Sequence, residues 1–290
     1  MKKLIACLLA LLLCGASALA ETEMAAKLTV VNCNEFITLR EEPDTASAAL
    51  ARIPLRQWAI SLGAEQNGFV RVGYQGQAGW ALAKYLSPQR EYGSSVDVTD
   101  AQRYNLNLFL SNFTEAGFCW QEGAYDSDWK VDAQLTEFAA DHCWFNRQSR
   151  LEWGEYFDWN NVRLPESQIA PVVKKYFGRN ITPSHQPPYM DYKNGYYYWQ
   201  ETGGHTSDGF ACLDWVEALG NGRYRVGFHI YAGDTNWSND ACRYTPDQAR
   251  RAYPSYDGRY REGCAVIDVG KSGLNDRSGW ALTRYAVNYD

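Results

Sequence analysis

Residues 28–87 read as short β-strands separated by turn residues, and no other part of the sequence restricts the possible folds as strongly. The segment FVRVGY, residues 69–74, alternates its side chains so that one face of a strand can be buried. The stretch YQGQAGW, residues 74–80, follows as a tight hairpin in which Gly76 can adopt the positive φ of the turn. About 60 residues are close to the lower limit for one hydrophobic core, so the sequence predicts a small closed barrel.

Two stretches of this segment carry a family resemblance. ITLREEPDTASAALARIP (37–54) and GFVRVGYQGQAGWALAKYLS (68–87) are similar to the bacterial SH3 (SH3b) domain family. The sequence departs from the family pattern at Thr38, where Asn is frequent, and at Phe69, where Trp is frequent. The positions that match are Leu39, Arg40, Pro43, Gly68, Val72, Tyr74, Gly76, Gly79, Trp80, Tyr85 and Leu86.

The resemblance implies an SH3-like barrel of five or six strands that recognises cell-wall or peptide ligands outside bacterial cells, without catalysis. Its candidate ligand-binding residues here are Tyr74, Trp80 and Tyr85, whose rings can form an aromatic surface. The alternative for Trp80 and Tyr85 is a place in the core or at the seam of the barrel.

The first residues have the pattern of a secretory signal peptide. Two lysines precede the apolar run 4–13, and small residues follow, so we expect a signal peptide over residues 1–20 with cleavage after Ala20. A membrane-spanning helix needs about 20 residues, and this apolar run is shorter. We therefore expect no transmembrane segment in the mature chain. The sequence therefore predicts a secreted bacterial protein, and a lipid anchor on Cys14 is the alternative to simple cleavage.

The charge balance argues against two classes of partner. Without the signal peptide, 26 basic residues face 34 acidic ones, which disfavours nucleic acid and anionic lipid surfaces as general ligands. Phosphate-binding and dinucleotide-binding glycine patterns and the H-E-x-x-H motif are absent from the sequence, and its histidines are scattered. We therefore expect no cofactor and no metal site.

The cysteines predict disulfide bonds but do not define which residues pair. An exported chain can oxidise its thiols, but the six cysteines that lie beyond the predicted signal peptide allow fifteen pairings. Short separations in sequence favour Cys119–Cys143 and Cys242–Cys264 as first expectations. Because Cys33 is alone in the N-terminal unit, either it bridges the two domains or two thiols stay unpaired. The six are Cys33, Cys119, Cys143, Cys212, Cys242 and Cys264.

A second domain of different character follows. The polar residues 88–95 predict a linker, and residues 96–290 predict an α+β domain with helices packed on one face of an antiparallel sheet. From Tyr196 onward, apolar segments alternate with glycine-rich turns, which predicts four or five antiparallel strands. No family resemblance is evident beyond residue 95.

Three segments precede those strands. Residues 132–148 place apolar side chains at helical spacing, and residues 164–178 do so with Pro165 in the first turn. Pro171 interrupts the second helical pattern, so it either kinks or divides that helix. Residues 106–113 are too apolar to be exposed and predict a strand or an irregular buried segment.

The segment from Cys242 to Cys264 interleaves arginines with tyrosines. Arginine offers planar donors to carboxylate or phosphate, and tyrosine rings stack, so Arg250, Arg251 and Tyr256 are further candidate ligand-binding residues. The alternative is an ordinary amphipathic helix whose arginines pair with surface acids.

The sequence supports a catalytic site less well than a binding site. The loop with His205, Ser207 and Asp208 suits a hairpin turn better than a triad, because neighbours on one loop rarely converge. Cys212 lies in mid-strand with His229 expected on the adjacent strand, which does not suit a reactive thiolate. Paired acids of a glycosidase cannot be assembled from the sequence.

The sequence thus favours an envelope-associated binding protein over an enzyme. Its expected partner is cell-wall peptidoglycan or a peptide, and no catalytic residue is assigned. The alternative is a cell-wall-modifying hydrolase whose catalytic residues lie in the C-terminal domain.

Overall fold

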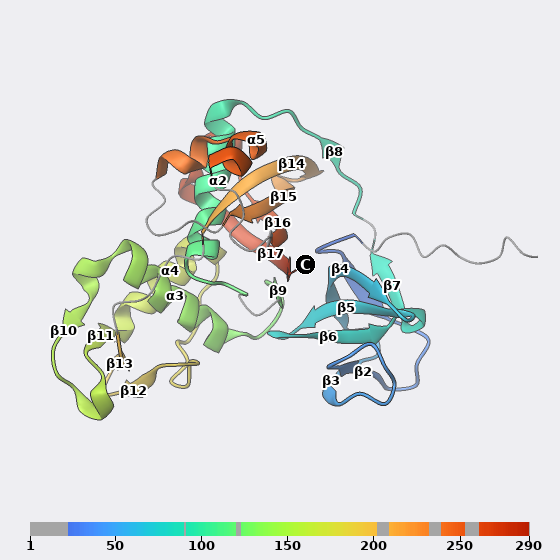
Figure 1. Ribbon diagram of the computed structural model, residues 1–290, viewed down its shortest axis with the longest axis horizontal. Coiled ribbons are helices and arrows are strands. Elements are labelled where there is room, and N and C mark those ends of the chain that lie inside the picture. The colour runs from blue at the N-terminus through green and yellow to red at the C-terminus, as the bar shows by residue number, and fades with distance from the viewer. Residues whose placement is uncertain are drawn as a thin grey trace, which may run out of the picture.

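The computed structural model describes residues 23–89, 91–119, 123–201, 209–231, 239–252 and 261–289. An antiparallel all-β unit comes first, and a mixed α+β region with four described α-helices and two further sheets follows (Figure 1). The predicted order of an all-β part followed by an α+β part is confirmed at this level. Among the described residues, no helix combines the length and the apolar character needed to cross a membrane.

The N-terminal β unit is a seven-stranded antiparallel sheet in the order β3-β2-β6-β5-β4-β1-β7. Strand β5 buries both of its faces except at Arg71, whereas its alternation predicted only one buried face. The second face is covered because β9 of the following region packs against β5, where a Cβ atom on Gly73 would lie 2.6 Å from that of Ala124. The strands are β1 (Lys27–Val30), β2 (Phe36–Arg40), β3 (Ala49–Pro54), β4 (Trp58–Gln66), β5 (Phe69–Tyr74), β6 (Gln77–Leu82) and β7 (Leu86–Gln89).

Two sheets build the α+β region. The larger one is antiparallel in the order β8-β14-β15-β16-β17-β9, and a small sheet has the order β10-β11-β13-β12. The strands predicted after residue 196 are present, but the first of them, β13, belongs to the small sheet. The bounds are β8 (Ser94–Ser95), β9 (Gly123–Asp126), β10 (Glu152–Trp153), β11 (Val162–Pro165), β12 (Asp191–Lys193), β13 (Tyr196–Trp199), β14 (Phe210–Gly220), β15 (Arg223–Tyr231), β16 (Arg261–Asp268) and β17 (Ala281–Tyr289).

Helix α2 (Asp100–Glu115) replaces the strand or irregular segment expected over residues 106–113. Its N-terminus is closed by a capping box, in which Thr99 accepts a hydrogen bond from the Gln102 amide at 3.3 Å and its own amide donates to the Gln102 side chain at 3.0 Å. The expectation that residues 106–113 are largely buried agrees with the structure, but they are helical, and polar side chains of the segment are buried as well. Asn107, for example, accepts a hydrogen bond from the backbone amide of Leu213 at 2.8 Å on the edge of β14.

Two other helices follow their predictions with one correction. Helix α3 (Asp132–Asn146) matches the predicted span, but α4 (Ile169–Phe177) begins later than the pattern suggested. Residues 162–165 form β11 instead, so Pro171 falls in the first turn of α4, where its missing N–H leaves no hydrogen bond unmade. The expectation that Pro171 kinks or divides this helix is therefore wrong. Gly178 ends α4 with φ 66°, the left-handed conformation that glycine adopts without steric cost.

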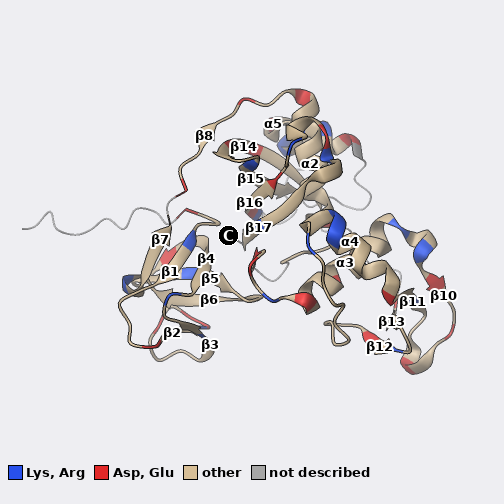
Figure 2. Cartoon of the chain, turned by 180° about the vertical axis from the view of Figure 1, so that it is seen from behind, with Lys and Arg blue, Asp and Glu red and all other residues tan. Residues whose placement is uncertain are grey.

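One continuous hydrophobic core links the β unit with the α+β region. Buried charges reinforce the junction: Arg284 of β17 contacts Glu91 at 2.7 Å and Asp126 at 3.4 Å, and it donates to the carbonyl of Ala25 at 3.1 Å. Lys27 of β1 also contacts Asp126, at 3.1 Å. Figure 2 shows positions of Lys, Arg, Asp and Glu along both the β unit and the α+β region. Residues at both ends of the predicted linker lie in strands β7 and β8.

All six cysteines are free thiols in the structure, so neither expected pair is joined. Their sulfur atoms have other neighbours. The Cys119 sulfur accepts a hydrogen bond from Gln134 at 3.3 Å, and Cys143 is buried in the main core. Likewise, the Cys242 sulfur lies 3.7 Å from the Ser111 hydroxyl, whereas Cys264 is buried on β16.

Candidate functional site

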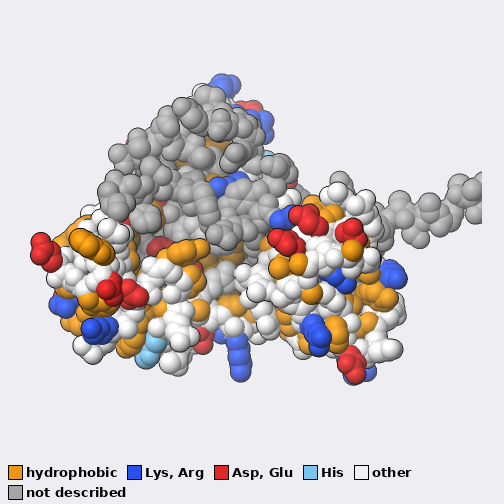
Figure 3. All heavy atoms as spheres, turned by 60° about the horizontal axis from the view of Figure 1, so that its bottom comes forward, with side chains coloured by type: hydrophobic (Ala, Val, Ile, Leu, Met, Phe, Trp, Pro, Cys, Tyr) orange, Lys and Arg blue, Asp and Glu red, His pale blue; other side chains and the backbone are white. Residues whose placement is uncertain are grey.

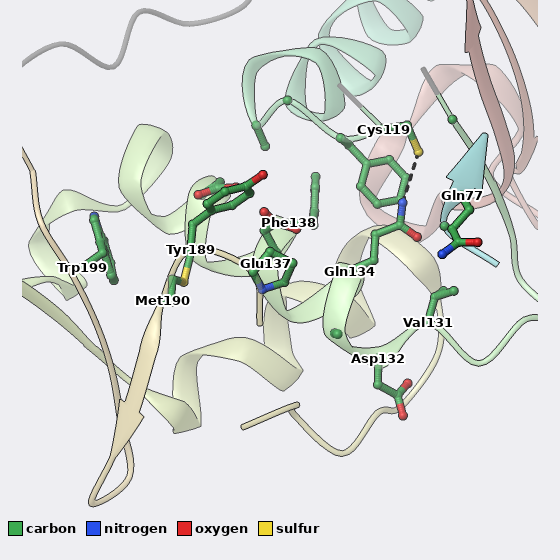
Figure 4. Close-up of a pocket in the computed structure, with 18 of the residues that line it drawn as sticks. Gln77, Cys119, Val131, Asp132, Gln134, Glu137, Phe138, Tyr189, Met190 and Trp199 are labelled. Atoms are coloured by element: carbon green, nitrogen blue, oxygen red, sulfur yellow. Dashed lines mark hydrogen bonds between the residues drawn. The ribbon is translucent and has the colours of Figure 1, made fainter. Parts of the chain in front are cut away.

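A cavity of about 1360 Å³ lies where the β unit meets the α+β region. Its walls come from the β5–β6 hairpin at residues 75–78, the turn after α2 at 115–119, and residues 130–145 around α3. Further lining comes from residues 158–160 and 188–190. Figure 4 shows Gln77 of the hairpin on one side, Glu137 and Phe138 of α3 centrally, and Tyr189 and Trp199 on the other side. Its volume is ample for a ligand larger than a single small molecule.

Glu137 is the carboxyl group of the cavity with the most altered titration. It is half-buried on α3 and makes no hydrogen bond or ion pair with another residue of the described ranges. Burial raises the pKa of Glu137 to about 7, because desolvation disfavours the charged carboxylate. This group therefore gains or loses its proton near neutral pH.

The remaining charges of the cavity are mainly negative. Burial also raises the pKa of Glu115, and a hydrogen bond of 2.8 Å from Asn146 opposes that rise. Of the described residues that line the cavity, five are acidic and two are basic, so its field attracts cations. These residues are Glu115, Asp132, Glu137, Asp141 and Asp158, with Arg71 and Lys130.

Aromatic rings form the far side of the cavity. Trp144 of α3 lies 6.4 Å from Trp199 of β13, as measured between ring centroids, and both line the cavity. Trp153 of β10 does not line the cavity, but its ring centroid lies 5.5 Å from that of Trp144. Trp153 is 55 % exposed and Tyr189, at the rim, is 82 % exposed. Tyr189 also has a φ of 61°, a left-handed conformation that is costly for a bulky residue. Figure 3 shows hydrophobic side chains exposed on the lobe that holds the small sheet.

Side-chain amides complete the lining. Five amide residues face the cavity, and the oxygen Oε1 of Gln134 is buried without a hydrogen-bond partner among the described residues. The hairpin that carries two of them is held by the edge-to-face contact of Tyr74 with Trp129, at 6.0 Å between ring centroids. The amide residues are Gln75, Gln77, Gln134, Asn160 and Gln200.

The aromatic residues expected to bind ligand in the β unit do not share a surface. Tyr74 is 7 % exposed and Trp80 is 6 % exposed, because Tyr74 packs on Trp129 and Trp80 lies under the Arg71 guanidinium at 5.4 Å. Tyr85 is half-buried, with the Lys84 ammonium 4.8 Å from its ring. The alternative of a core position describes Trp80 in this structure.

The second group of expected binding residues lies on the short helix α5 (Pro246–Ala252). Arg250 and Arg251 are exposed, neither lines the cavity, and Arg250 forms an i,i+3 ion pair with Asp247 at 3.4 Å. That arrangement matches the alternative of an amphipathic helix with paired arginines. Tyr256 lies outside the described residues.

Thiol catalysis has no support at Cys212. It lies opposite His229 in the β14–β15 ladder, but it is fully buried, and burial raises its pKa to about 12. His229 instead makes a short hydrogen bond to Asp214, and its other ring nitrogen lies 3.4 Å from Glu262. The hydrogen bond to Asp214 raises the pKa of His229, despite its partial burial.

The loop with His205, Ser207 and Asp208 lies outside the described residues. Within the described part of the chain, no group of three or more His, Cys, Asp or Glu side chains is arranged to hold a metal ion.

Sequence reasoning missed the cavity and Glu137. Glu137 lies beside the apolar stripe of a correctly predicted helix, three residues after Gln134 and four before Asp141. A carboxyl group beside an apolar stripe indicates only weakly that it lies at the boundary between core and surface. The covering hairpin at residues 75–78 comes from a segment about 60 residues earlier, and no local pattern reveals it. The chain has no significant match among protein-family models, curated protein sequences or solved structures.

Proposed function

We propose that the protein is a secreted, envelope-associated bacterial binding protein whose N-terminal β unit is an SH3b-like barrel. Its ligand is cell-wall peptidoglycan or a peptide, and the protein does not cleave it. The short antiparallel strands and the eleven matching sequence positions support the barrel, and the signal-peptide pattern supports export.

The ligand binds in the cavity between the β unit and α3, through a free amino group. The observation that carries this proposal is the excess of carboxyl groups in the cavity around Glu137, which has no ion-pair partner in the described ranges. A ligand ammonium group would neutralise the Glu137 carboxylate at a site already partly shielded from water, where charge pairing is stronger than at a surface.

The test is a pelleting assay with the full mature chain and purified cell-wall sacculi. We expect the protein to sediment with the sacculi, and Glu137→Gln to weaken sedimentation by roughly tenfold, equivalent to about 1.4 kcal/mol. The exposed Glu35→Gln is the matched control, because Glu35 does not line the cavity. Wild-type protein that stays in the supernatant would overturn the proposal.

A second candidate function is a cell-wall hydrolase, and one observation favours it. A carboxyl group with a pKa of about 7, such as Glu137, is suited to donate a proton to a leaving group at neutral pH. The same assay separates the two, because a hydrolase releases soluble sugars or peptides from the sacculi and a binding protein does not.

A further inference from the structure

The aromatic side of the cavity offers a different chemistry from its carboxyl groups. Trp153, Trp144 and Trp199 contact one another in series, so that rings continue from an exposed surface into the cavity lining. Tyr189 stands at the rim with its ring exposed. We call these four residues the aromatic wall.

An exposed ring that is held in place is costly to keep unless something covers it. Tyr189 combines high exposure with a left-handed backbone, and such strain persists only where the surrounding structure imposes it. The segment that carries it is tied down nearby, because Asn160 donates a hydrogen bond to Asp191 at 3.0 Å. The ring is therefore presented by an anchored segment.

Two side-chain amides lie beside the aromatic wall: Gln200 follows Trp199 directly, and Asn160 lines the same cavity. Gln134, whose oxygen has no hydrogen-bond partner among the described residues, lies toward the other end of the cavity, where its amide nitrogen bonds to Cys119 (Figure 4). Side-chain amides both donate and accept hydrogen bonds, as sugar hydroxyl and acetamido groups require. Aromatic faces pack on the C–H faces of pyranose rings, burying apolar area while the hydroxyl groups at the ring edges remain free for these amides.

We infer that the aromatic wall is a saccharide subsite, which binds a neutral oligosaccharide by ring stacking and amide hydrogen bonds. The inference rests on the proposed function, because it takes the cavity as the ligand site. It adds that one ligand can engage two chemistries, an amine at the carboxyl end and sugar rings along the aromatic wall.

The experiment is a titration of the full mature chain with a soluble hexamer of N-acetylglucosamine, followed by isothermal calorimetry and tryptophan fluorescence. We expect saturable binding, and a rise in Kd of roughly tenfold for Tyr189→Ala and for Trp153→Ala. Tyr92→Ala is the matched control, because Tyr92 is 81 % exposed and does not line the cavity. Its Kd should stay within about twofold of wild type. Circular dichroism of each variant confirms the fold.

Two results would overturn the saccharide subsite: no binding of the hexamer at millimolar concentration, or equal Kd values for wild type and both aromatic variants. A parallel titration with a short peptide, blocked at both termini, whose only charged group is one lysine tests the amine site. Peptide binding that depends on Glu137, without hexamer binding, refutes the subsite and leaves the proposed amine site standing. Hexamer binding that depends on Tyr189, without peptide binding, supports the saccharide subsite and refutes the proposed amine site.

Discussion

The β unit and the α+β region contribute different side chains to the cavity and its rim. The β unit buries Tyr74 and Trp80, and its hairpin contributes amides to the cavity. The α+β region leaves Trp153 and Tyr189 exposed and supplies all five carboxyl groups of the described cavity lining, Glu137 among them. The region with a family resemblance thus contributes shape and support, whereas the region without one contributes most of the candidate chemistry, and the cavity exists only where they meet.

The largest effect is expected from removing a buried charge at the junction between the two regions. Arg284→Ala removes the partner of Asp126, whose side chain is 2 % exposed, and leaves that carboxylate with Lys27 as its cation. Because Lys27 compensates the buried Asp126 carboxylate only in part, and the ion pair of Arg284 with Glu91 is lost as well, we expect the free energy of unfolding to fall by about 3 kcal/mol in urea denaturation.

The matched control is Arg223→Ala. Arg223 pairs with Glu91 at 2.9 Å, but both side chains are about one-third exposed, so the loss should stay below about 1 kcal/mol. Equal losses for the two variants would show that the junction is not held by its buried charges.

The contrast between local and distant contacts explains what the sequence could predict. The span of α3 depends on neighbours within a few residues, and the predicted range 132–148 agrees with the observed Asp132–Asn146 to within two residues. The helical state of residues 106–113 was missed, because the Asn107 side chain satisfies the edge of β14, more than a hundred residues away. The cavity was missed for the same reason, since its walls come from separate parts of the chain.

A second variant tests the steric contact between the two regions and leaves their charges unchanged. Gly73 on β5 faces β9 so closely that an added Cβ atom would lie 2.6 Å from the Ala124 Cβ and 2.9 Å from its amide nitrogen. Gly73→Ala must therefore shift one of the two strands, and we expect a loss of about 2 kcal/mol in unfolding free energy.

The double variant Gly73→Ala with Ala124→Gly sharpens this test, because it removes one of the two clashing carbon atoms. In a double-mutant cycle, we expect the pair to be more stable than the sum of the single changes predicts. Additive effects would mean that β5 and β9 do not approach each other as the structure describes.

The smallest expected effect concerns Glu137, which belongs to α3 but lies in a cavity that the β-unit hairpin completes. Its pKa of about 7 exceeds the ordinary 4.5, so between these values the folded protein holds a proton that the unfolded chain has lost. Stability therefore falls as pH rises from about 4.5 to about 7 and is constant in this respect above that.

The Glu137→Gln variant has no titratable group at this position, so its difference from the wild type measures the contribution of Glu137 to the pH dependence of stability. The variant and the wild type should be equally stable near pH 4.5, and above pH 7 the variant should be more stable by about 1 kcal/mol, allowing for the partial solvent exposure of the carboxyl group. Glu91, whose pKa of about 2 arises from Arg284 and Arg223 overcoming its burial, titrates below this window and is common to both proteins. Chemical denaturation at several pH values measures the difference. A constant difference from pH 4.5 to 8 would mean that the hairpin does not shield Glu137 from water, and the two regions would then not build the site together.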